Sequence, residues 1–180
     1  MNPATPDPTL LGLPPILDAR TRLLVLGSFP SVASLQAQQY YAHPRNHFWP
    51  IVSALWGLTG SQSLQHRPYA DRVTAALDHG LGIWDVYARC RRQGSLDSAI
   101  EQAELNPLHE LRQRAPGLLG IAHNGGESAR HIKITQTLGL PVLKLPSTSP
   151  ANASWSFESK LAAWGEAFER FGLLPTPMAG

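Results

Sequence analysis

Residues 23–31 read LLVLGSFPS, and this stretch decides the fold that the sequence predicts. Its first four residues are apolar and are followed by a glycine and a polar residue. That pattern is typical of a short, fully buried strand that ends in a loop. Three further stretches have the same character, each rich in Leu, Ile or Val and bounded by Gly or Pro, at residues 81–86, 118–123 and 142–145. Continuous apolar runs of this length indicate buried parallel strands.

Helical patterns separate these strands. Apolar residues recur at helical spacing from Phe48 to Leu55, with Asn46 placed where an N-cap would sit. Similar patterns run through residues 69–79, from Asn106 towards Pro116, and through 128–138 and 156–171. Strands that alternate with helices predict a three-layer α/β/α sandwich around a four-stranded parallel sheet. Ligands bind such sheets at the carboxyl ends of the strands.

The composition indicates one ordinary globular domain. At roughly 150 residues per domain, the 180 residues form a single domain over residues 1–180, with loose tails at about 1–20 and 174–180. The single cysteine, Cys90, cannot form an internal disulfide or a Cys-rich metal centre. No apolar run approaches the ~18 residues of a membrane span, and the N-terminal stretch does not resemble a signal peptide. We therefore expect no membrane association and a cytoplasmic location.

The charge gives little indication of a partner. The net charge is +2, and arginine supplies most of the 15 basic residues, which suits bidentate contact with phosphates. The densest basic cluster is Arg89, Arg91 and Arg92. It can be interpreted as a loop that faces phosphates or as a solvated turn.

Two of the loops after the predicted strands have unusual composition. The loop GSFPSVASLQAQQYYAHPRNHFWP at residues 27–50 is longer and more aromatic than a connector needs to be. The turn that begins at Gly27 and Ser28 could present backbone N–H groups to an anion or a base carbonyl, or it could be an ordinary turn. The loop LPSTSPANAS at residues 145–154 carries Ser147, Thr148 and Ser149. Such short hydroxyls suit phosphate contacts, although a loop with an N-cap is the simpler interpretation.

Five ordered motifs give the chain a resemblance to a known family. They are GSFPS at 27–31, YYAHPRNHFWP at 40–50, GIWDVY at 82–87, AHNGG at 122–126 and LPSTSPANA at 145–153. Together they resemble the uracil-DNA glycosylase superfamily, most closely its hypoxanthine (deoxyinosine) DNA glycosylase branch. The resemblance implies an enzyme that flips a deaminated base out of DNA and hydrolyses its N-glycosidic bond, without a metal or another cofactor.

The chain departs from the family pattern at Phe29. Most of the superfamily has Asp or Asn at this position of the turn, where the polar side chain positions or activates the water. A phenyl ring can do neither, so the catalytic polar group must come from elsewhere. The resemblance of the HPRN stretch to the family segment implies that Asn46 holds the water. Asn46 could also act as a helix N-cap, and the two roles could coexist.

Further site residues follow from the same motifs. Asp85 ends the second strand and, apart from Glu127, is the only carboxylate beside the strand-end loops. It could accept a hydrogen bond from the flipped base or act as general base, or it could be a turn or N-cap residue. Tyr41 and Phe48 are candidates for stacking on the base. Asn124 could contact the base or a phosphate, or it could be a surface turn residue.

Other chemistries lack a motif. His43 and His47 are four residues apart, but Pro44 interrupts any helix between them, so a metal site is not expected. His43 is instead counted, with Ser28 and Phe29, among the residues expected to bind substrate. No serine-hydrolase elbow, Walker loop or dinucleotide fingerprint is present in the sequence.

The function predicted is a monomeric DNA repair glycosylase that acts on DNA containing a deaminated base, with hypoxanthine first and uracil and xanthine as further candidates. The alternatives are a noncatalytic nucleic-acid-binding module on the same scaffold and a hydrolase of free nucleosides. The sequence does not fix the base preference. It also does not identify the side chain that fills the gap left by the flipped base, for which residues 151–155 are the first place to look.

Overall fold

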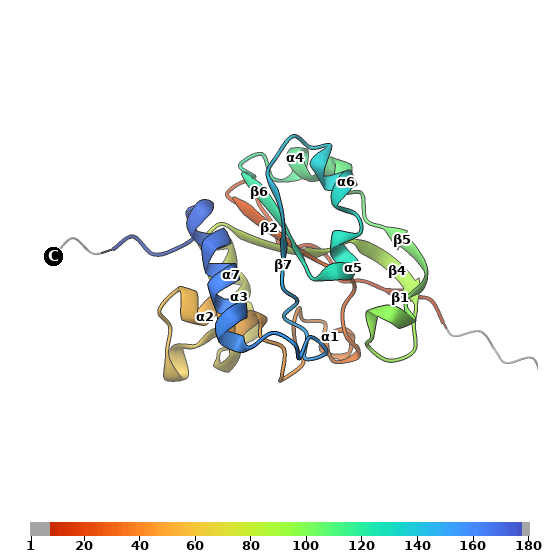
Figure 1. Cartoon of the computed structure of the whole chain (residues 1–180), viewed down its shortest axis with the longest axis horizontal. Coiled ribbons are helices and arrows are strands. Elements are labelled where there is room, and N and C mark those ends of the chain that lie inside the picture. Colours follow the sequence, from red (N-terminus) through yellow and green to blue (C-terminus); the bar gives the residue numbers. More distant parts are fainter. Residues whose placement is uncertain (1–7, 178–180) are drawn as a thin grey trace, which may run out of the picture.

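The computed structural model describes residues 8–177 and contains a central parallel sheet. Its strands are β2 (Leu23–Gly27), β3 (Leu81–Asp85), β6 (Gly120–Asn124) and β7 (Val142–Leu145), in the order β3-β2-β6-β7 (Figure 1). β2 lies in the middle, where Leu23 is opposite Leu81 of β3 and Gly120 of β6. The four strands predicted from the apolar runs are confirmed.

Helices cover both faces of this sheet (Figure 1). One layer holds α2 (Phe48–Leu55), α3 (Tyr69–Asp78) and α7 (Phe157–Arg170), and the other holds α4 (Leu111–Arg114), α5 (Gly126–Ala129) and α6 (Ile132–Gln136). The predicted three-layer α/β/α architecture is therefore confirmed.

The core explains why these segments adopt their structures. Every residue of β2 is buried, as expected for a central strand with helices on both faces. α2 buries Phe48 and Trp49, and α7 buries Trp164 and Phe168 on one stripe. A Cβ at Gly120 would overlap the ring of Phe171, so only glycine lets β6 approach the end of α7.

A second, antiparallel sheet was not predicted. It contains β1 (Leu10–Leu11), β4 (Tyr87–Arg91) and β5 (Glu101–Leu105), in the order β1-β4-β5. The prediction of a loose tail up to about residue 20 is wrong for the described part of that segment. Leu10 pairs with Cys90, and Leu13 and Ile16 are buried in the core, because these apolar residues cover one edge of the sheets. Residues 175–177 are exposed, and residues 1–7 and 178–180 lie outside the described part.

The basic cluster lies in and just after β4 and is neither a phosphate-facing loop nor a solvated turn. Arg89 forms an ion pair with Glu104 of β5 at 3.3 Å. Arg92 is buried, and its guanidinium donates to the carbonyl oxygens of Pro30 and Gly94. Arg89 therefore stabilises the second sheet, and Arg92 stabilises the turn after β2.

Several connections also differ from the sequence prediction. α1 (Val32–Ala37) lies within the loop expected after the first strand, and Ser31 caps it through a hydrogen bond from the Ser34 N–H. Asn106 is not an N-cap, because its Nδ2 donates to the Asp85 carbonyl oxygen at 2.8 Å. The helix predicted over 128–138 is split into α5 and α6. Short 3-10 helices occupy Gly60–Gln62, Leu64–His66, Asp97–Ala99 and Leu108–Glu110.

Candidate active site

A cavity of about 510 Å³ opens at the carboxyl ends of the central strands. Its lining comes from the last residues of β2, β3, β6 and β7, from the loops after β2, β6 and β7, and from the loop between β4 and β5. The volume is within the usual range for small-molecule sites, and the position is the one expected for a ligand in a parallel sheet. All the predicted site residues except His43 and Phe48 line this cavity.

Asp85 and Gly27 form the floor of the cavity. The Asp85 side chain comes from the end of β3, is 5% exposed and leaves Oδ2 without a hydrogen-bond partner within residues 8–177. A Cβ at position 27 would overlap Asp85 Oδ1, so glycine is needed for this carboxyl group to lie over β2. Burial, with a further contribution from the charge of Asp97, raises the pKa of Asp85 to about 7, against a smaller lowering by Arg92. The cavity therefore contains a carboxyl group that is partly protonated near neutral pH.

Asp97 is a second carboxylate of the cavity, and it was not predicted from the sequence. It lies in the loop between β4 and β5, and the Ser28 hydroxyl donates to its Oδ1 at 2.6 Å. Partial loss of solvent and the charge of Glu127 raise the pKa of Asp97, while the Ser28 hydrogen bond and Arg92 oppose this shift. The expectation that Asp85 and Glu127 are the only carboxylates at this edge of the sheet is therefore wrong. The sequence carries no signal for Asp97, because the hairpin that brings it to the cavity was not predicted.

Asn46 caps α2 and also lines the cavity. Its Oδ1 accepts a hydrogen bond from the Phe48 backbone N–H at 2.9 Å, which stabilises the first turn of α2. The same side chain is half-buried and lines the cavity, and its Nδ2 makes no hydrogen bond within the part of the chain that the structure describes. Asn46 is therefore held by the helix with its amide N–H group free for a ligand or a water.

Tyr41 provides the aromatic wall, and Phe48 supports it. The two rings stack with centroids 4.1 Å apart and an interplanar angle of 22°. Phe48 is fully buried and does not line the cavity, so the prediction that Phe48 stacks on a base is wrong. Its position on the core stripe of α2 places it behind Tyr41. One face of Tyr41 is covered by Phe48, which leaves the other face for a ligand.

Asn124 forms hydrogen bonds with residues of two other motifs, Tyr41 and Thr148. Its Nδ2 donates to the Tyr41 hydroxyl at 3.1 Å and to Thr148 Oγ1 at 3.0 Å, and its Oδ1 accepts from the Thr148 backbone N–H. Both amide hydrogens are used, so only the remaining lone pair of Oδ1 is left for a ligand. Thr148 is completely buried, which contradicts its predicted contact with a phosphate. Asn124 and Thr148 instead fix the loop after β7 against β6 and Tyr41.

Ser147 and Ser149 keep the placement expected for phosphate contacts. Both are half-buried and line the cavity. Ser147 Oγ accepts from the Ser149 N–H at 3.2 Å, and Ser149 Oγ accepts from the Ala151 N–H at the same distance. These bonds use the hydroxyl oxygens as acceptors, so the hydroxyl hydrogens are available to donate to an anion.

Phe29 forms an apolar part of the wall. The ring is buried, and the guanidinium of Arg92 lies over it, with Cζ 5.2 Å from the ring centroid. Phe29 brings no polar atom to the cavity, in agreement with the interpretation of this position from the sequence. The polar groups nearest in the sequence are Ser28 and the backbone of the turn.

His43, which begins the HPRN stretch, and His47, which follows it, have different surroundings. His43 does not line the cavity, and its Nδ1 accepts from the Arg45 N–H at 3.1 Å, so its predicted contact with substrate is not supported. His47 lies 3.2 Å from the buried ammonium group of Lys160, measured from Nδ1 to Nζ. Burial and this ammonium group lower the pKa of His47. Within residues 8–177, no group of three or more His, Cys, Asp or Glu side chains could hold a metal ion.

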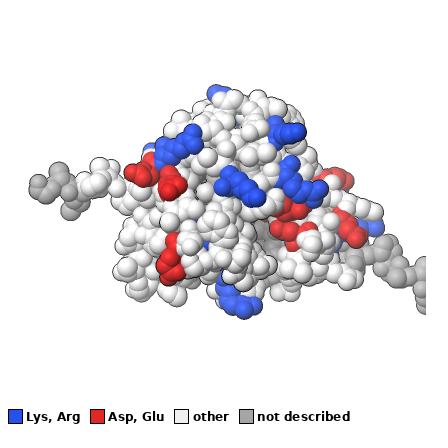
Figure 2. All heavy atoms as spheres, in the orientation of Figure 1, with Lys and Arg blue, Asp and Glu red and all other residues white. Residues whose placement is uncertain are grey.

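On the face drawn in Figure 2, basic and acidic side chains are interspersed and form no continuous basic surface. None of the helices described is both long and apolar enough to cross a membrane.

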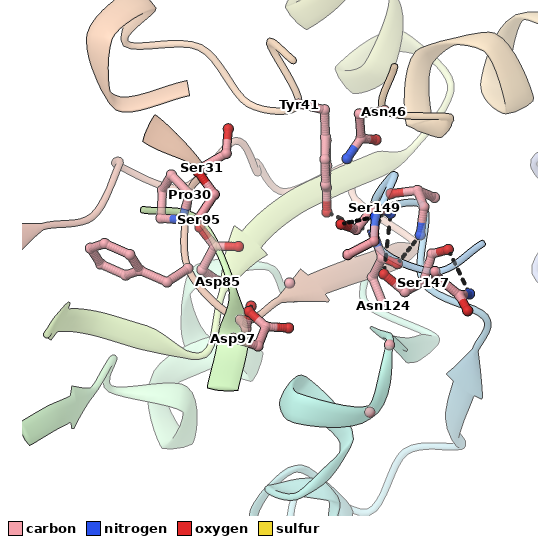
Figure 3. Close-up of a pocket in the computed structure, with 18 of the residues that line it drawn as sticks. Pro30, Ser31, Tyr41, Asn46, Asp85, Ser95, Asp97, Asn124, Ser147 and Ser149 are labelled. Atoms are coloured by element: carbon pink, nitrogen blue, oxygen red, sulfur yellow. Dashed lines mark hydrogen bonds between the residues drawn. The ribbon is translucent and has the colours of Figure 1, made fainter. Parts of the chain in front are cut away.

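The cavity has two chemically different sides (Figure 3). Asp85 and Asp97 lie on one side, and Tyr41, Asn46, Asn124, Ser147 and Ser149 lie on the other. Carboxylates accept hydrogen bonds from N–H groups, an aromatic face stacks on a planar ring, and free amide and hydroxyl groups donate. The arrangement suits a flat heterocycle with N–H groups that is attached to an anionic backbone.

This α/β sandwich, with its polar cavity at the carboxyl ends of the parallel strands, is of the class that binds ligands at that edge of the sheet. The family model of the "Uracil DNA glycosylase superfamily" matches residues 14–169, and the chain belongs to this superfamily. The family membership indicated by the five motifs is confirmed.

Three similar proteins agree with this assignment. The chain is 35% identical to the "Hypoxanthine DNA glycosylase" of Methanosarcina barkeri over 88% of its own length and 98% of that protein. It is 34% identical to the "Hypoxanthine DNA glycosylase" of Methanosarcina acetivorans over 87% and 96% of the two chains. A solution NMR structure of a candidate uracil DNA glycosylase from Methanosarcina acetivorans superposes with a TM-score of 0.80 at 32% identity, covering 91% of this chain and 99% of the other.

Proposed function

We propose that this chain is a DNA repair glycosylase that removes hypoxanthine from DNA. The observation that carries the proposal is an uncompensated carboxyl group on the floor of a cavity whose opposite side presents a free amide and an aromatic face. Two relatives that cover most of the chain are named hypoxanthine DNA glycosylases. The enzyme acts as a monomer in the cytoplasm and uses neither a metal nor another cofactor.

The difference in burial between Asp85 and Asn46 supports different roles for the two side chains. The flipped base enters the cavity first, so its edge reaches the deepest group, while C1′ of the sugar stays nearer the mouth. Asp85 is nearly inaccessible, whereas Asn46 is half-buried. Asp85 therefore accepts a hydrogen bond from N1–H of hypoxanthine. Adenine has a lone pair at N1 instead of an N–H group, so the same carboxylate disfavours the normal base.

Asn46 holds the water that attacks the sugar. The water oxygen bonds to C1′, the C1′–N9 bond breaks with its electron pair on the base, and a proton of the water passes to the base. The transition state resembles an oxocarbenium ion, so a placed water and a stabilised leaving base supply most of the rate. Tyr41 stacks on the base, and the hydroxyls of Ser147 and Ser149 donate to the phosphates on either side of the flipped nucleotide.

The activity is tested with end-labelled duplexes that carry one hypoxanthine, uracil or xanthine. Enzyme is in excess, a chelator is present, and alkali converts abasic sites to strand breaks. We expect breaks at hypoxanthine. Binding of these duplexes without any break would favour the noncatalytic module, and cleavage of free inosine would favour a nucleoside hydrolase.

The role of Asn46 is tested by Asn46→Ala under single-turnover conditions. We expect the rate to fall by more than about tenfold, a loss of ~1.4 kcal/mol in transition-state stabilisation, while the duplex still binds. Since the side chain also caps α2, the matched variant is Asn46→Asp, which keeps an oxygen acceptor for the Phe48 N–H. Equal thermal stability of Asn46→Asp and the unmodified protein would confirm that the capping bond is kept. If the rate of Asn46→Ala is unchanged, Asp85 or Asn124 must position the attacking water instead.

A further inference from the structure

Lys160 is a buried cation that has no carboxylate partner. The side chain is 1% exposed and lies near the N-terminus of α7, where the helix dipole disfavours positive charge. Within residues 8–177, Lys160 forms no ion pair, and Glu158 in the same turn of the helix is exposed. Burial lowers the pKa of the ammonium group. A buried charge without a counter-ion is costly, so an anion from outside the chain would stabilise it.

His47 connects this cation to the surface. The Lys160 ammonium group can only donate, so His47 Nδ1 accepts its hydrogen bond at 3.2 Å and the ring proton is on Nε2. The ring is held edge-on to Phe157, with centroids 5.3 Å apart. Nε2 makes no hydrogen bond within the described part of the chain and is not a buried atom, so its N–H group reaches solvent. His47 therefore presents an N–H donor that is polarised by the buried cation.

This donor is fixed beside the loop that carries Ser147 and Ser149. The His47 backbone N–H donates to the carbonyl oxygen of Thr148, between these two serines, at 2.9 Å. Asn46, the residue before His47, lies on the same side of the cavity as Ser149 (Figure 3). A DNA strand that contacts the two serines would therefore pass close to His47.

The charges on this side of the cavity suit an anion. Arg45 is exposed two residues before His47 and forms no ion pair within residues 8–177. The carboxylates Asp85 and Asp97 lie on the other side (Figure 3). A phosphodiester only accepts hydrogen bonds, so it requires donors of this kind. We propose that His47 Nε2–H donates to a DNA phosphate next to those held by the serine loop, with Lys160 as the buried cation behind the ring. This inference rests on the proposed function, because it takes DNA as the ligand.

The experiment measures equilibrium binding to duplexes that carry a tetrahydrofuran abasic analogue, which has no base to remove. One phosphate at a time is replaced by an uncharged methylphosphonate on the strand with the analogue. At one position we expect this replacement to weaken binding of the unmodified protein at least about fivefold. The same replacement should weaken binding of Lys160→Met less than about twofold, because that variant has already lost the contact.

Lys160→Met should also bind the fully charged duplex at least about fivefold more weakly, and the slope of log affinity against log salt should fall by about one. Methionine fills a similar volume and removes a buried charge, so the fold should be kept, which thermal unfolding checks. The matched control is Lys133→Met, which removes an equal charge from an exposed position on α6, in the other helical layer. The control should change the affinity less than about twofold.

A second variant tests whether the two side chains act together. His47→Phe keeps an aromatic ring against Phe157 and removes both ring nitrogens. It should lose as much affinity as Lys160→Met, and the double variant should lose no more than either single variant. The double variant also leaves no ammonium group without its acceptor, so its binding can be measured even if His47→Phe alone is unstable.

Three results would overturn the inference. The first is a Lys160→Met variant that binds the fully charged duplex as tightly as the unmodified protein. The second is a folded Lys160→Met variant that binds more weakly but stays fully sensitive to every methylphosphonate, which would make the role of Lys160 structural. The third is a double variant in which the two losses add. Protein that binds the analogue but releases no hypoxanthine would refute the proposed function, while the methylphosphonate scan still decides the role of His47 and Lys160.

Discussion

Asp85→Asn should change the stability of the protein in a pH-dependent way. The pKa of Asp85 rises from 3.8 to about 7 in the fold, a difference of about 3 units. At 1.36 kcal/mol per unit, ionising this carboxyl in the folded protein costs about 4 kcal/mol. Because the folded-state pKa is above the unfolded one, the associated stability is complete below about pH 4 and is lost as the pH rises through 7. About 2–3 kcal/mol of it disappears between pH 5 and 8.

The amide that replaces the carboxyl group cannot ionise, so the variant should lack this part of the pH dependence. Relative to the unmodified protein, Asp85→Asn should gain about 2–3 kcal/mol in free energy of unfolding between pH 5 and pH 8, although it should excise hypoxanthine poorly at either pH. Urea denaturation at the two pH values measures this difference. Glu169→Gln, which removes an exposed carboxyl on α7, is the control and should have little effect at either pH.

The result that refutes this reasoning is a difference in unfolding free energy that stays the same, within about 0.5 kcal/mol, at pH 5 and pH 8. Asp85 would then be ionised at both values, and a charge in this cavity would have to be compensated by a group that the fold brings there. A gain in stability that is accompanied by full activity would separately contradict the role of Asp85 in reading the base.

The cavity gives three further predictions. Gly27→Ala places a methyl group on the original position of Asp85 Oδ1, so the carboxyl must move, and single-turnover excision should fall at least about tenfold. Phe29→Asp introduces a carboxylate beside the buried guanidinium of Arg92, so we expect the two groups to form an ion pair. The rate of uracil excision should then rise by no more than about twofold. A larger gain would show that the new carboxylate positions or activates the attacking water. Asp97→Asn removes a charge that raises the pKa of Asp85, so the acid limb of the pH–rate profile should move to lower pH, and a limb that stays in place would contradict the coupling.

The central sheet could be predicted from the sequence because its strands lie on short runs rich in Leu, Ile and Val, and three of the four, β2, β3 and β6, are completely buried. Every residue of β2 and β3 is buried, so each strand has a continuous apolar run that can be recognised in the sequence. β5 has the opposite character, since all five of its residues, EQAEL, are exposed. Its pairing with β4 depends on backbone hydrogen bonds and on contacts such as the ion pair of Arg89 with Glu104. A sequence window without apolar alternation does not predict such a strand.

Some site residues were predicted wrongly or not at all, because their positions depend on tertiary contacts that leave no pattern in the sequence. Asp97 and Leu96 were not predicted as site residues, because the β4–β5 hairpin that brings them to the cavity was not predicted. The motif that contains Phe48 holds several aromatic residues, and the sequence does not tell which ring lies in front. Tyr41, with φ at +55°, lines the cavity, whereas Phe48 is completely buried in the core. Thr148 shares its residue type with good phosphate ligands, but its burial under Asn124 depends on tertiary contacts.

The central claim is hydrolysis of the N-glycosidic bond of hypoxanthine in DNA. The most direct measurement is the amount of free hypoxanthine released from a duplex with a single lesion, determined by chromatography in the presence of a chelator and compared with the abasic sites formed. We predict one free base per abasic site, with the yield sharply reduced in Asn46→Ala. Folded protein that binds the duplex and releases no base would contradict the account.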